Sequence, residues 1–158
     1  MTTKPLKKGA TYDDLARVPE HYVAEMFDGD LYASPRPAFP HARAAMALAA
    51  KLGGPFDLDR SGSGGWFLLS EPELHFGNDV LVPDVAGWRR ERLPAIPNVA
   101  YLTLAPDWIC EVVSPSTESI DRSEKAAHLR TRRCVARVAR RSVTAVARSV
   151  GSAIRKPR

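Results

Sequence analysis

Apolar residues recur at helical spacing in the first third of the chain. Residues 41–52 (HARAAMALAAKL) are rich in alanine, and their apolar positions lie three or four residues apart before Gly53 and Gly54. This pattern predicts a helix over residues 41–52 that ends at the two glycines. A shorter helix is expected over residues 11–17, where Thr11 can cap the N-terminus and acidic residues lie in the first turn.

Short apolar or alternating runs dominate the middle of the chain and predict β-strands. Asp28 and Gly29 form the turn of a hairpin expected over residues 26–34. Further strands are expected over residues 65–69, 73–76 and 108–113, and in two stretches of residues 79–88 on either side of Pro83. A third helix is expected after the last of these strands. The order of helix, strands and helix predicts an α+β fold with a central mixed sheet flanked by helices.

Composition places the chain among soluble globular domains. Its 158 residues are 44% hydrophobic and 26% charged, which suits one domain with a buried core. No run of about 18 apolar residues is present, so no membrane span is expected. The basic N-terminus is not followed by the apolar segment of a secretory signal. Cys110 and Cys134 are too few for a disulfide scaffold and lack metal-site spacing. A cytoplasmic protein is therefore expected.

Charge is distributed unevenly along the chain. Residues 1–121 contain 11 Lys and Arg against 17 Asp and Glu, whereas residues 122–158 contain 12 Lys and Arg and one acid. The net charge is therefore −6 in the body and +11 in the C-terminal part, so the body is not an obvious polyanion-binding surface. Valines recur through the C-terminal part, which is interpreted either as a basic amphipathic helix or as a disordered cationic tail.

Two acidic residues stand out in the strand-rich region. Asp84 follows Pro83, and Glu111 interrupts the apolar run Trp-Ile-Cys-Glu-Val-Val. A carboxylate is costly to bury in such a run unless it is paired or bound to a metal. Two carboxylates on adjacent strands can hold a hard cation such as Mg²⁺, and such a cation can activate water for phosphodiester hydrolysis. The alternatives are that Glu111 faces solvent on its strand and that Asp84 is a turn residue.

Four ordered segments carry a resemblance to a known family. They are EMFDGDLYASPRPAFPHARA (residues 25–44), GGWFLLSEPELHFGNDVLVPD (64–84), VPDVAGWRRERLP (82–94) and PDWICEVVSPSTESIDRSEK (106–125). Together they resemble the Uma2 family of restriction-endonuclease relatives, also called DUF820, which is similar to the PD-(D/E)XK nucleases. The resemblance covers about residues 20–128. It implies a restriction-endonuclease-like core and metal-dependent hydrolysis of DNA.

The resemblance also implies roles for individual residues. Asp84 would be the aspartate of the PD motif and Glu111 the second acidic ligand, and together they would hold Mg²⁺ or Mn²⁺. The superfamily lysine would fall at Val113, which has no ammonium group, and the family position on the following helix is matched by Lys125. Lys125 would orient the attacking water or stabilise the phosphate charge, the alternative being a solvated helix lysine. Many such nucleases act as homodimers.

Other residues are weaker candidates. Glu73 is either an accessory ligand or a surface acid at a strand end. His41 opens the predicted helix and either contacts a substrate phosphate or serves as a capping or surface residue. Glu25, Asp28 and Asp30 match an acidic segment of the family, although a turn also explains them.

The chain departs from the family pattern after about His128. Residues 1–128 are expected to form the nuclease-like domain, incomplete at its C-terminal end, and residues 129–158 the basic tail. Codons permitted for residues 130–149, read one base downstream, can encode Val-Trp-Leu-Val-Asp-Pro, a strand typical of the family. A frameshift near His128 is therefore a hypothesis that the nucleotide sequence of the gene would test. Without that strand, residues 108–113 are expected to form an exposed sheet edge.

Two other functions compete with that of a metal-dependent endonuclease. The first is an inactive, truncated relative that keeps only the first half of the fold. The second is non-specific nucleic-acid binding through the tail, because positive charge alone suffices for such binding. Residues 130–158 contain no aromatic side chain, so stacking on bases and sequence specificity are not expected from them.

Overall fold

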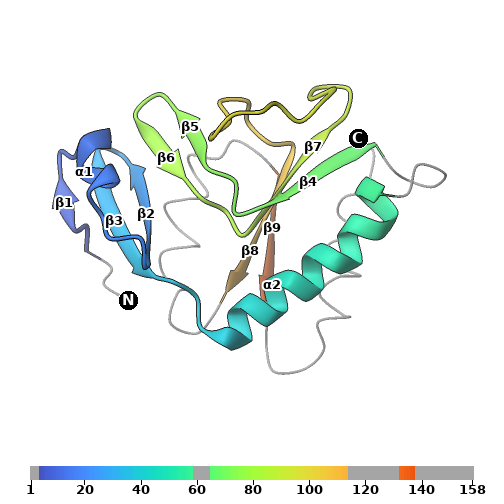
Figure 1. The fold of residues 1–158 in the computed structure, drawn as a ribbon, viewed down its shortest axis with the longest axis horizontal. Helices are drawn as coiled ribbons and strands as arrows, with labels where there is room; N and C mark the ends of the chain where they lie inside the picture. The colour runs from blue at the N-terminus through green and yellow to red at the C-terminus, as the bar shows by residue number, and fades with distance from the viewer. Residues whose placement is uncertain (1–3, 59–64, 114–131, 138–158) are drawn as a thin grey trace.

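In the part of the chain that the structure describes, two β-sheets and one long helix build the fold (Figure 1). This computed structural model describes residues 4–58, 65–113 and 132–137. The elements in chain order are β1 (Lys7–Lys8), α1 (Tyr12–Ala16), β2 (Tyr22–Phe27), β3 (Asp30–Pro35), α2 (Phe39–Leu52), the π-helical turn η1 (Gly53–Leu58), β4 (Trp66–Ser70), β5 (Leu74–Phe76), β6 (Asp79–Leu81), β7 (Val85–Arg89), β8 (Trp108–Val113) and β9 (Arg132–Arg137).

The strands divide into a five-stranded sheet and a four-stranded sheet. The five-stranded sheet has the order β1-β3-β2-β6-β5, and its neighbouring strands are antiparallel. The four-stranded sheet has the order β4-β7-β8-β9 and is mixed, because β8 and β9 run parallel while the other pairs are antiparallel. The prediction of an α+β fold with a mixed sheet is confirmed, and the strands outside that sheet form a second one.

The predicted hairpin joins β2 and β3. Phe27 pairs with Asp30, so Asp28 and Gly29 alone form the connecting turn. Their φ angles are 55° and 76°, the left-handed values that a two-residue hairpin turn with positive φ requires. Aspartate and glycine tolerate these angles better than most residues, which is why this turn could be predicted from two adjacent letters.

Helix α2 begins two residues earlier than the pattern predicts and ends at Leu52, as predicted, with Gly53 as its C-cap. Gly53 has φ −58° and ψ −45°, so it continues the right-handed coil, and η1 extends the coil to Leu58. The predicted end of the α-helix is confirmed, but the π-helical turn that follows it was not predicted. Glycine permits a left-handed cap without requiring one, and the extra turn buries Phe56 in the core beneath the helix.

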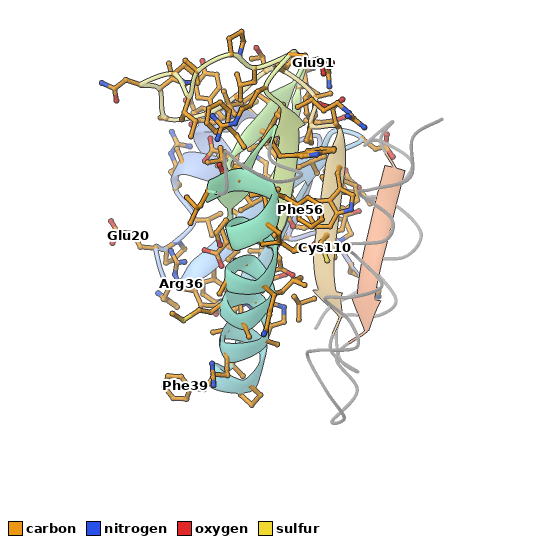
Figure 2. All side chains as sticks on the ribbon, turned by 90° about the vertical axis from the view of Figure 1, so that its right-hand side faces the viewer. Glu20, Arg36, Phe39, Phe56, Glu91 and Cys110 are labelled. Atoms are coloured by element: carbon orange, nitrogen blue, oxygen red, sulfur yellow. The ribbon has the colours of Figure 1, made fainter. Side chains whose placement is uncertain are left out.

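The mixed sheet lies between α2 and the five-stranded sheet. Ala44, Leu48 and Leu52 of α2 pack against one face of β8 through Trp108, Cys110 and Val112. Ile109, on the opposite face of β8, joins a second core cluster with residues of β2, β5, β6 and β7. Because side chains alternate along a strand, Glu111 belongs to the face of Ile109. Figure 2 shows Cys110 and Phe56 in the layer between α2 and β8.

Strand β8 is not an edge strand. It pairs with β7 on one side and with β9 on the other, in a parallel register from Trp108 opposite Arg132 to Val113 opposite Arg137. The prediction of an exposed edge is therefore wrong, because β9 supplies partners for the main-chain groups of β8. Part of the basic segment forms this strand, whereas residues 138–158 and the helix predicted after residue 113 lie outside the described residues. Among the described residues, no helix combines the length and the apolar character needed to cross a membrane.

Helix α1 has the predicted N-terminal cap. Asp14 Oδ2 accepts hydrogen bonds from the Thr11 main-chain N–H (2.9 Å) and from the Thr11 hydroxyl (3.0 Å). The Asp14 carboxylate also pairs with Lys7 Nζ at 2.7 Å. The Lys7 ammonium and the Thr11 donors lower the pKa of Asp14 to about 2.

The stability contributed by Asp14 is therefore expected to depend on pH. A carboxylate with a lowered folded-state pKa stabilises the fold above its unfolded pKa of about 3.9, and this contribution is lost as the pH falls through the folded value. Asp14→Asn should lower the urea midpoint at about pH 7, and the difference from wild type should shrink as the pH falls from about 5 towards 2. Asp13→Asn is the matched control, because the structure pairs Lys7 with Asp14. A difference that does not change with pH would contradict the assignment.

Candidate functional site

Asp84 and Glu111 face each other across two neighbouring strands. Val85 of β7 pairs with Cys110 of β8, so one further step of the antiparallel register places Asp84 opposite Glu111. The Asp84 main-chain N–H donates to Glu111 Oε2 at 3.4 Å. The structure therefore brings together the two acids that the sequence separates by 27 positions.

Several contacts fix the backbone that leads into Asp84. Glu25 is buried, with 8% of its surface exposed, and its Oε1 accepts the Val82 N–H at 2.8 Å. The Asp84 carbonyl accepts the Glu71 N–H at 3.1 Å and the Ser70 hydroxyl at 3.4 Å. The main chain from β6 to β7 is thus held on both sides of the proline, so the Asp84 side chain starts from a well-defined position.

Each of the two carboxylates accepts a hydrogen bond from a main-chain N–H of the segment that carries the other acid. Glu111 is buried inside β8, with 5% of its surface exposed, and its Oε2 reaches the backbone of Asp84. Asp84 Oδ2 in turn accepts the main-chain N–H of Val112. A buried carboxylate is costly unless it accepts hydrogen bonds or meets a cation, and these reciprocal contacts offset part of that cost.

His41 of α2 is a third member of this cluster. Its Nε2 lies 3.4 Å from Asp84 Oδ2, and the two side chains are 15% and 14% exposed. The contact with Asp84 raises the pKa of His41 above its ordinary value, with smaller contributions from the Val112 backbone and the Glu111 charge, while burial opposes the shift. The sequence interpretation of His41 as a capping or surface residue does not match this buried contact.

A signal for His41 was present in the sequence. It lies three positions before Ala44 and seven before Leu48, which are both buried beneath α2. Residues with this spacing share one face of a helix, so His41 belongs to the core-facing side. The pattern alone could not show which side chain it would meet.

The remaining candidates are dispersed. Lys125 lies outside the described residues. Glu73 Oε1 pairs with His75 Nε2 at 2.6 Å. His75 belongs to β5, and Glu73 immediately precedes this strand. Asp30 Oδ1 accepts the Gly9 N–H at 3.4 Å, and Asp28 belongs to the hairpin turn. The turn interpretation therefore holds for Asp28, whereas Asp30 begins β3 and Glu25 lies within β2.

The donor set of Asp84 and Glu111 fits a hard divalent cation that keeps part of its water shell. Carboxylate oxygens are the ligands that Mg²⁺ prefers, and proteins often hold Mg²⁺ by one or two carboxylates together with waters and substrate phosphates. In the part of the chain that the structure describes, no group of three or more His, Cys, Asp or Glu residues could hold a metal. The pair therefore suits a cation shared with a substrate better than one enclosed by protein ligands.

The two sheets, with α2 packed on the mixed one, form an α+β domain, and comparison with a solved structure shows which fold class it resembles. The structure is similar to the crystal structure of a putative nuclease belonging to DUF820 from Anabaena variabilis ATCC 29413. The TM-score is 0.50 at 21% sequence identity, and the match covers 75% of this chain and 64% of that one. The chain thus spans less than two thirds of the length of that protein.

The particular family follows from the sequence. The model of the Uma2 family, described as a putative restriction endonuclease, matches residues 10–139, and the chain belongs to this family. A search of curated proteins found no match. The family resemblance inferred from the motifs is confirmed, and the match continues beyond His128, where the composition changes.

Proposed function

We propose that this protein is a metal-dependent endonuclease that hydrolyses phosphodiester bonds in DNA, with Asp84 and Glu111 as the ligands of Mg²⁺ or Mn²⁺. The observation that supports this best is the contact of the Glu111 carboxylate, on β8, with the main chain of Asp84, the residue before β7, in a chain of the Uma2 family. A nuclease family implies a nucleic acid as substrate. The choice of DNA and of the cation belongs to the proposal.

The geometry suits the binding of a cation beside a rigid sheet. Glu111 is held inside β8, which pairs on both sides, and Asp84 is held by the backbone contacts that flank Pro83. When bound, the cation would polarise a phosphate oxygen and lower the pKa of a water molecule. Glu111 is buried and Asp84 half-buried, so their charges act more strongly on a cation than they would in solution.

Lys125 completes the proposal. Its ammonium group would orient the attacking water or stabilise the negative charge that develops on the phosphate. This role comes from the family resemblance, because Lys125 lies outside the described residues. Val113 stands where the superfamily has its lysine, so Lys125 is the basic residue that matches the family position.

Cation-dependent plasmid nicking tests the proposal. The purified full chain is expected to relax supercoiled plasmid with Mg²⁺ or Mn²⁺ and to lose this activity in excess EDTA, because the carboxylates supply only part of the chemistry. Asp84→Asn, purified in the same way, is the control for contaminating nuclease and should not relax the plasmid. Single-stranded DNA and RNA substrates in parallel reactions test the choice of DNA.

Two results would contradict the proposal. Nicking that persists in EDTA would exclude a dependence on divalent cations. Equal nicking by wild type and Asp84→Asn would show that the activity does not belong to this site. A wild-type chain that binds plasmid but never nicks it would instead support the inactive relative.

A further inference from the structure

We infer that His41 is a positioning residue that holds the Asp84 carboxylate in the orientation needed to bind a cation. The inference rests on the proposed function of Asp84 as a metal ligand. It assigns to α2, an element outside the two acidic strands, a direct part in shaping the site.

The first argument is which oxygen of Asp84 is occupied. The Val112 N–H and His41 Nε2 both meet Oδ2. Within the described residues these contacts leave Oδ1 as the oxygen to face a cation. One donor fixes only one direction of a carboxylate, whereas two donors from different elements also limit its rotation. Outer partners of this kind orient metal ligands and are often as important as the ligands themselves.

The second argument is the rigidity of the element that carries His41. Leu48 and Leu52 of α2 are each 1% exposed and pack against β8 in the core cluster. The helix therefore cannot move relative to the sheet without breaking that packing. Because His41 belongs to this helix, its side chain contacts the Asp84 carboxylate from a fixed position.

The third argument is that His41 is unfavourable where it lies unless the Asp84 contact offsets the cost. Its Nδ1 is buried without a hydrogen-bond partner among the described residues, which is unfavourable for a polar atom. The cap of α2 does not require a histidine, because Ala38 is the N-cap residue and no side-chain cap is formed. The contact with Asp84 is thus a favourable interaction that helps to hold this ring in place.

Cation binding without DNA provides the test. Mn²⁺ affinity of the full chain is measured by calorimetry for wild type, His41→Leu and His41→Gln. His41→Leu keeps a similar volume but has no donor, and it should weaken Mn²⁺ binding about 10- to 100-fold. His41→Gln retains an amide N–H donor and should bind Mn²⁺ within a few-fold of wild type. His75→Leu is the matched control, because His75 is 16% exposed and also pairs with a carboxylate, that of Glu73.

The outcomes separate this inference from the proposed function. Equal Mn²⁺ affinity in wild type and His41→Leu would overturn the inference and leave the function intact. Wild type without Mn²⁺ binding would overturn the proposed function and the inference together. If His41→Leu fails to fold, the Mn²⁺ affinity of His41→Gln tests the inference instead. A folded His41→Gln that loses Mn²⁺ binding would overturn the donor role of His41. A loss of affinity in His75→Leu equal to that in His41→Leu would also overturn it.

A double variant distinguishes positioning from a general effect on structure. If His41 acts through Asp84, His41→Leu should cause no further loss of Mn²⁺ affinity in the Asp84→Asn background. An additional loss of the same size as in wild type would show that His41 acts independently of Asp84 and would overturn the inference.

Discussion

Glu111→Gln is expected to reduce cation-dependent nicking by about 10²-fold or more, because stabilisation by a bound cation contributes several kcal/mol to such a reaction. Glutamine keeps the volume of the side chain and an oxygen that can accept the Asp84 N–H, but it removes the negative charge. The fold should therefore survive while the affinity for the cation falls. Rates of plasmid relaxation and Mn²⁺ titrations measure the two effects separately.

Glu73→Gln is the matched control for this variant. Glu73 is a carboxylate beside a strand of the other sheet and pairs with His75, so its nicking rate should equal that of wild type. A Glu111→Gln protein that keeps more than about half of the wild-type rate would show that Glu111 is not a ligand, since a lost ligand should cost far more. If Glu111→Gln unfolds at the same temperature as wild type, its loss of nicking comes from the missing negative charge and not from unfolding.

Trp88→Ala is expected to destabilise the fold by about 3–5 kcal/mol, the usual cost of removing a buried tryptophan. Trp88 is 0% exposed and lies in the core cluster between the two sheets. Its Nε1 donates to the Leu104 carbonyl at 2.9 Å, and loss of that donor leaves the carbonyl without this hydrogen bond. Urea unfolding followed by far-ultraviolet circular dichroism measures the change.

Trp88→Phe separates packing from hydrogen bonding. Phenylalanine keeps most of the apolar contact but has no N–H, so the loss should be clearly smaller than for alanine. A destabilisation of Trp88→Ala below about 1 kcal/mol would contradict the packing of the two sheets around this ring. Trp88 contributes to the site only through stability, so nicking per folded molecule should be unchanged.

Local patterns predicted the strands and the hairpin well. Residues 108–113 were predicted as one strand and form β8 with the same bounds. The hairpin turn was predicted at Asp28 and Gly29, where both φ angles are positive. These features depend on side-chain alternation and turn chemistry, which are properties of a few adjacent residues. Such local preferences do not depend on how the rest of the chain folds.

Features that depend on distant residues were predicted poorly. The coil continues past Gly53 because Phe56 finds a place in the core, which glycine alone does not indicate. Strand β9 arises from a segment that reads as a basic tail, because β8 offers it main-chain partners along a full strand. Sequence-local propensity is a weak guide wherever tertiary contacts of this kind outweigh it.

The sequence by itself singled out the two candidate ligands: an aspartate after a proline at a strand start and a glutamate inside an apolar strand, set among the motifs of the Uma2 family. Only the tertiary structure decided how they meet. It placed Asp84 beside Glu111 through the register of β7 and β8, and it brought His41 to the same carboxylate from α2. The reason is that residue type is encoded locally, whereas a contact between residues 41, 84 and 111 depends on the packing of a helix on a sheet.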